Sequence, residues 1–149
     1  MGVAATTSEG RVESARASAL GGAGTAVGRD PTLVWNNPAS MGSIADTSVT
    51  VAGSTGLFGA RNGFGLYAYP FGRWVVGAGV SYYDSGEIKL NASDGTSRRL
   101  TGRREIMVAG GVAATPVPRL IAGVLLKGLY SSLVEEFHAA NVIGDIGLQ

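Results

Sequence analysis

The hydrophobic pattern changes character at residue 47 of the 149-residue chain. From there on, large apolar residues alternate with small or polar ones, which is the two-residue period of β-strands. Each strand is therefore predicted to have one face of large apolar side chains and one face of small or polar side chains. The alternation defines six segments: 47–55, 63–71, 73–84, 104–114, 119–130 and 137–148.

Residues 1–46 lack this alternation and are rich in glycine and other small residues. Residues 11–20 suit a helix, which the Gly21-Gly22 pair would end. Asp30-Pro31 is a second start signal, with Asp as the cap and Pro at the first helical position, for a turn or two that ends at residues 36–38. The sequence therefore predicts a short helical head, residues 1–46, followed by an antiparallel sheet, residues 47–149.

The connections between the six segments alternate in length, so all short turns are expected at one end of the sheet and all long loops at the other. The connection over residues 84–103 is the longest and contains Asp94-Gly95, a hairpin signal. It is predicted to be a long loop, or a strand pair that extends beyond the main sheet.

Alternation of this kind fits a soluble sandwich, whose apolar faces meet in a core, or a transmembrane barrel, whose apolar faces meet lipid. Strand length favours the barrel, because most segments reach the ~9–11 residues that a tilted membrane strand requires. The face opposite the large residues carries Lys127, Asn141 and Asp145, which are the candidates for facing the lumen. Aromatic residues lie near strand ends, as they do at membrane interfaces; they are Tyr69, Phe71, Trp74, Tyr82 and Tyr130.

Composition also favours the barrel over the soluble sandwich. Only 15% of the residues are charged although 45% are hydrophobic, whereas soluble globular chains carry nearer a quarter charged residues. The formal net charge of +1 gives no reason to expect a nucleic acid partner. Cysteine is absent, which excludes a disulfide framework and a thiolate nucleophile. The apolar run at 120–126 is far shorter than the ~18–20 residues of a membrane helix.

Six strands do not close a membrane barrel, because the smallest single-chain barrels have eight and an open edge in lipid leaves backbone groups unpaired. The remaining strands are expected from a longer chain or from other copies. The first alternative is favoured because the sequence ends in mid-pattern at Gly147-Leu148-Gln149. No secretory signal is visible in residues 1–10.

Several motifs, taken in order, resemble those of a known family. The chain is similar to the start of mature PorV/PorQ-type outer-membrane proteins, which are relatives of the FadL fatty-acid transporters. The resemblance rests on Leu20-Gly21-Gly22-Ala23-Gly24-Thr25-Ala26-Val27, Asp30-Pro31, Trp35-Asn36-Asn37-Pro38-Ala39, Tyr67-Ala68-Tyr69-Pro70-Phe71-Gly72, Tyr83-Asp84-Ser85-Gly86-Glu87-Ile88 and Asp145-Ile146-Gly147-Leu148.

The resemblance implies an all-β outer-membrane barrel of about fourteen strands, of which this chain supplies about six, with the N-terminal segment as a plug inside it. The plug motif would comprise Gly21, Gly22, Gly24, Asp30, Pro31, Trp35, Asn36, Asn37 and Pro38. FadL-like members pass hydrophobic molecules, whereas PorV-like members bind secreted cargo and proteins of the type IX secretion system. The expected location is the bacterial outer membrane, and the expected partners are outer-membrane lipid together with either hydrophobic small molecules or secretion-system proteins.

Signals of catalysis are weak. The glycines of residues 63–68 fit a dinucleotide fingerprint only as a string, because they lie inside a predicted strand and open no helix. His138 is the only histidine and has no cysteine to share a metal with. We therefore predict no enzyme, no cofactor and no metal site. Arg98-Arg99 and Arg103-Arg104 are expected in outer loops, as solvated charges or as contacts to lipopolysaccharide.

The competing interpretation is a soluble glycine-rich β-sandwich that acts as a structural or protein-interaction module. The two interpretations differ at the face of residues 119–130 that includes Ala122 and Val124. A barrel exposes this face to lipid, and a sandwich buries it in protein.

Overall fold

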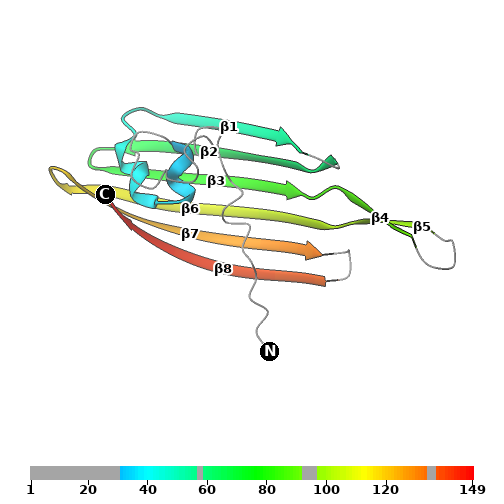
Figure 1. Cartoon of the computed structure of the whole chain (residues 1–149). Coiled ribbons are helices and arrows are strands. Elements are labelled where there is room, and N and C mark those ends of the chain that lie inside the picture. The colour runs from blue at the N-terminus through cyan, green and yellow to red at the C-terminus, as the bar shows by residue number, and fades with distance from the viewer. Residues whose placement is uncertain (1–30, 57–58, 92–96, 134–136) are drawn as a thin grey trace.

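A computed structural model describes residues 31–56, 59–91, 97–133 and 137–149 (Figure 1). Two short 3-10 helices precede eight β-strands. The helices are η3, Pro31–Trp35, and η4, Pro38–Ser43. The strands are β1 Ser48–Thr55, β2 Arg61–Phe71, β3 Trp74–Asp84, β4 Glu87–Asn91, β5 Ser97–Thr101, β6 Arg103–Val117, β7 Leu120–Leu133 and β8 Phe137–Leu148.

Six of the strands form one antiparallel sheet in the order β1-β2-β3-β6-β7-β8. The predicted all-β antiparallel fold is therefore confirmed. The sheet is open rather than closed into a barrel, and β1 and β8 are its edges in the described part of the chain.

The long connection after β3 contains the strand pair β4–β5, which is the second of the two predicted alternatives. The pair extends beyond the end of the main sheet (Figure 1). Its Asp94-Gly95 turn lies outside the described residues. Arg103, which was expected in an outer loop, begins strand β6 instead and pairs with Leu133 of β7. Arg104, the first residue of the predicted segment 104–114, is in the same strand and pairs with Ser132, so its assignment to an outer loop is wrong and its assignment to a strand is confirmed.

The turns also follow the predicted alternation. Two tight turns, at Gly72 and Arg119, join β2 to β3 and β6 to β7 at one end of the sheet, where β8 also ends (Figure 1). Both residues have a positive φ, 61° for Gly72 and 75° for Arg119. The β4–β5 extension lies at the opposite end, which we call the long-loop end.

The two faces of the sheet have different surroundings. One face, the inner face, carries η3 and η4 over its short-turn end, and no described element packs on the opposite outer face (Figure 1). The core lies between the helices and the inner face. It comprises Val34, Trp35, Met41 and Ile44 of the head with Leu66, Ala68, Val75, Met107, Ala113, Leu125 and Leu129 of the sheet.

The helical segment at Asp30-Pro31 was predicted, and η3 occupies it from Pro31 on. The second helix was missed. Asn37-Pro38 was interpreted as an end, yet the Asn37 side chain caps η4 by accepting a hydrogen bond from Ala39 N at 3.0 Å. Pro38 fills the first helical position, where its missing N–H costs nothing. The predicted helix at 11–20 and the motif residues Gly21, Gly22, Gly24 and Asp30 lie outside the described residues.

Candidate functional site

The outer face carries a continuous surface of apolar residues, most of them exposed. Strand register aligns them in rows across the sheet, such as Val76, Val112, Val124 and Ile146 on β3, β6, β7 and β8. Val124 is 47% exposed and Ile146 is 84% exposed. We call this surface the apolar band; it comprises Val49, Val51, Gly65, Tyr67, Tyr69, Val76, Ala78, Val80, Val108, Gly110, Val112, Val124, Leu126, Gly128, Val142, Gly144 and Ile146.

Aromatic residues border the apolar band at both ends. Phe71 and Trp74 are paired across the short turn, at 69% and 53% exposure. At the other border Tyr82 and Tyr130 flank Ile106 in a single row. From Trp74 to Tyr82 the band measures about 26 Å along the strand, or about 20 Å in height once tilted, near the ~25 Å apolar belt of outer-membrane barrels. All five predicted interface aromatics, Tyr69 included, are exposed on the outer face.

The next row beyond Tyr82 is polar. Register aligns Arg61, Asp84, Arg104, Ser132 and His138 across β2, β3, β6, β7 and β8. We call these five residues the boundary row. Both border tyrosines bond to it, Tyr82 donating to Asp84 Oδ2 at 2.9 Å and the Tyr130 hydroxyl lying 3.0 Å from His138 Nδ1. Tyrosine rings therefore face the apolar band while their hydroxyls contact the polar row.

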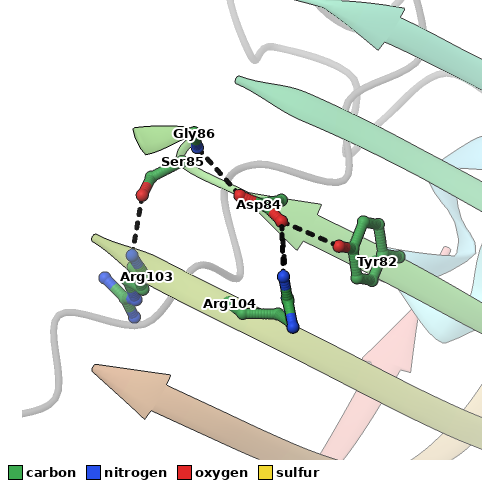
Figure 2. A network of polar contacts seen from close by, with 6 residues as sticks. All are labelled: Tyr82, Asp84, Ser85, Gly86, Arg103 and Arg104. Carbon is green, nitrogen blue, oxygen red and sulfur yellow. Dashed lines mark hydrogen bonds and ion pairs between the residues drawn. The ribbon is translucent and has the colours of Figure 1, made fainter. Parts of the chain in front are cut away.

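Asp84 is the centre of a polar network at the base of the β4–β5 hairpin (Figure 2). Its carboxylate accepts hydrogen bonds from Gly86 N at 2.8 Å and from Arg104 Nη2 at 3.2 Å. The Gly86 hydrogen bond, followed by those of Tyr82 and Arg104, holds the pKa of Asp84 below its ordinary value of 3.8. Ser85 also accepts a bond from Arg103 N at 2.7 Å. The network therefore fixes the direction in which the hairpin leaves the sheet.

The inner face holds the lumen-facing candidates. The Lys127 side chain is only 3% exposed, and its Nζ lies 2.6 Å from Asp145 Oδ2. The same Nζ donates to Trp35 O in the head at 3.0 Å. Asp145 is partly exposed, and Asn141 lies exposed on the same face near the long-loop end of β8. Lys127 thus joins the wall of the sheet to the predicted plug motif.

Glycines on the inner face form a close-fitting seat for the head. A Cβ at Gly123 would lie 2.5 Å from Pro38 C, and one at Gly79 would lie 2.8 Å from Trp35 Cζ2. Within the predicted motif, Trp35 and Pro38 are buried, Asn37 is partly buried and Asn36 is exposed. Because neither glycine has a side chain, backbone and rings of the head reach the sheet directly.

A second buried polar group was not predicted. Glu105 is 3% exposed on the inner face, forms an ion pair with Arg103, and accepts a hydrogen bond from Ser131 Oγ at 3.2 Å. The alternation places Glu105 on the face opposite the large apolar residues, but its burial is visible only in three dimensions.

Comparisons with protein-family models, with curated proteins and with solved structures find no match to this chain. In the described residues no helix is long and apolar enough to span a membrane. The same residues contain no group of three or more His, Cys, Asp or Glu side chains that could bind a metal ion. The resemblance to PorV/PorQ-type and FadL-like proteins stays a prediction, and the function must be argued from the two faces of the sheet.

Proposed function

We propose that the chain forms part of the wall of an outer-membrane β-barrel, with the head segment as a plug on its lumen side. The observation that carries the proposal is the apolar band. It has no charged residue between its aromatic borders, and no described element of the chain covers it. Exposed apolar surfaces of this extent are rare on soluble monomers and mark contact with membrane or protein.

The inner face supports the lumen side of the proposal. A barrel lumen accommodates polar groups, and this face holds Glu105, Lys127 and Asp145. In the rival soluble sandwich the apolar band would be the buried core, and the polar face would lie toward water. Here the head packs instead on the face that also carries the buried polar groups, and the apolar band is bare.

The edges of the sheet complete the proposal. Unpaired strand edges are costly in lipid, at several kcal/mol per backbone group. Strands beyond the described sheet, from a longer chain or from other copies, therefore pair with β1 and β8. With these strands the sheet closes into a barrel, and η3 and η4 project into its lumen.

Transport of hydrophobic molecules is the favoured activity, because the lumen side carries an apolar cluster on which the head packs, joined to it by the hydrogen bond from Lys127 to Trp35 O. A role in protein secretion is the second candidate. The β4–β5 hairpin favours it, since it projects beyond the aromatic border, where a partner protein could be contacted.

The test is whether single arginines block membrane assembly according to their place on the outer face. Val124→Arg lies in the apolar band and should cost about 2–4 kcal/mol near the bilayer midplane. Ser132→Arg, on the same face of the same strand but in the boundary row, is the matched control. The chain is exported in a Gram-negative host through an added signal, and carbonate-washed membranes are assayed for it.

Loss of Val124→Arg from the membrane with retention of Ser132→Arg is the expected result. If the unmodified chain is soluble and well folded, the membrane proposal is wrong and the sandwich replaces it.

A further inference from the structure

The boundary row contains more positive than negative charge at the level where lipid headgroups would lie. Arg61 and Arg104 oppose the single carboxylate of Asp84. Arg104 is 54% exposed, and Arg61 is exposed as well. Within the described part of the chain Arg61 has no hydrogen bond or ion pair, so its guanidinium is available to a ligand.

The backbone positions of both arginines are fixed, and the side chain of Arg104 is held as well. Both belong to paired strands, and Arg104 is held by two hydrogen bonds to Asp84, from Nε at 3.3 Å and from Nη2 at 3.2 Å (Figure 2). Asp84 in turn is held by Gly86 N and by the Tyr82 hydroxyl. Arg61 and Arg104 flank Asp84 on either side, two strands apart, which separates their backbones by about 10 Å.

The chemistry of the row selects its ligand. Arginine forms directional, charge-assisted hydrogen bonds with phosphate oxygens. Immediately next to the guanidinium groups lie tyrosine rings and then the apolar band, so the surface offers a phosphate site and an acyl-chain site in one continuous strip. A lipid with a phosphate headgroup fits both parts, whereas an acidic protein would leave the apolar part uncovered.

We propose that Arg61 and Arg104 bind the headgroup phosphates of anionic lipid at the membrane boundary. The inference rests on the proposed membrane location, and it adds the lipid class and the residues that select it. Asp84 lowers the net positive charge of the row and occupies the Nε and Nη2 donors of Arg104, so it competes with the phosphate, and its removal should strengthen lipid binding.

The test is native mass spectrometry of the full chain purified from membranes in detergent, titrated with phosphatidylglycerol and, separately, with zwitterionic phosphatidylcholine. We expect phosphatidylglycerol to bind more tightly. Arg61→Gln and Arg104→Gln should each weaken its binding about fivefold, and Arg61→Lys should retain most of it. Asp84→Asn should strengthen it, an effect of opposite sign that a merely structural ion pair would not give.

Arg73→Gln is the control, because Arg73 is an exposed arginine of the tight turn at the opposite end of the sheet, away from the boundary row. It should leave phosphatidylglycerol binding unchanged. Equal binding of both lipids by chain recovered from the membrane would overturn the inference while leaving the membrane location intact. Competition by inorganic phosphate at the same concentration as the lipid would overturn it too, because the site would then bind phosphate without its acyl chains. Absence of the chain from the membrane would instead contradict the proposed function.

Discussion

Two glycines of the sheet should respond to alanine in opposite directions. Gly123 of β7 lies on the inner face against the head, and Gly144 of β8 lies on the outer face. Neither has a positive φ, so alanine can adopt the backbone conformation at both positions. The difference between the two variants therefore measures how tightly the head is seated on the sheet.

The magnitude follows from the contacts. A Cβ at Gly123 would lie 2.5 Å from Pro38 C, 2.6 Å from Pro38 O and 2.7 Å from Ala39 N. All three are backbone atoms, so no side chain can turn away and the head must shift. Overpacking of this kind typically costs about 1–3 kcal/mol. A Cβ at Gly144 meets no atom within 4 Å, and alanine there should stabilise by about 0.4–1 kcal/mol through the unfolded chain.

The assay uses the two tryptophans of the chain. Trp35 belongs to the head and is 3% exposed where the head packs on the sheet, whereas Trp74 is 53% exposed on the outer face. In a Trp74→Phe background the fluorescence of Trp35 reports docking of the head during urea unfolding. We expect Gly123→Ala to lower the unfolding midpoint and to shift Trp35 emission to the red, and Gly144→Ala to do neither. Equal effects of the two substitutions would refute the described seat for Pro38.

Further predictions concern the polar groups. Lys127→Met should destabilise the folded chain by about 3 kcal/mol, because it leaves the Asp145 carboxylate without its cation; the Lys127→Met, Asp145→Leu pair should recover most of that loss, and additive losses in the double variant would contradict the pairing. The lowered pKa of Asp84 means that its contribution to stability is present above pH 3.8 and is lost as the pH falls through the folded-state pKa below that value. The protection factor of the Gly86 amide against hydrogen exchange should therefore fall in that acidic range in the native protein and show no such step in Asp84→Asn.

The strands were predictable because the alternation is strong wherever one face of a strand carries large side chains and the other carries small ones. On β3, Trp74, Val76 and Val80 alternate with residues as small as Gly77 and Gly79, and the structure places them on opposite faces. On β2 the sequence is less decisive, since both faces carry large residues. There packing decides, and Leu66 lies under the head while Tyr67 faces outward.

The head could be predicted only in part. Pro31 marked the start of η3, but Asn-Pro at residues 37–38 is compatible with both an end and a start. Its role as a start depends on the Asn37 side chain bonding to Ala39 N, a local detail that composition does not reveal. The glycines of the inner face were visible in the sequence. The sequence did not show why they are needed there, because the Trp35 ring and the Pro38 backbone that contact them are distant along the chain.

The candidate sites depend on register and could not be read from the sequence. Lys127 and Trp35 O are 92 residues apart, and nothing local links them. Arg61, Asp84, Arg104 and His138 form one row only because four strand pairings bring them to the same level. Arg103 and Arg104, adjacent in sequence, lie on opposite faces because strand side chains alternate.

The most direct test of the membrane proposal is to ask which face of the sheet contacts lipid. The chain contains no cysteine, so Val124→Cys on the outer face and Asn141→Cys, at an exposed inner-face position of the neighbouring strand β8, each provide a unique attachment point for a fluorophore. The labelled proteins are reconstituted in bilayers with and without lipids brominated along their acyl chains. We predict strong quenching of the label at position 124 and little at position 141. Equal, weak quenching at both positions would mean that protein covers the apolar band and would contradict the proposed barrel wall.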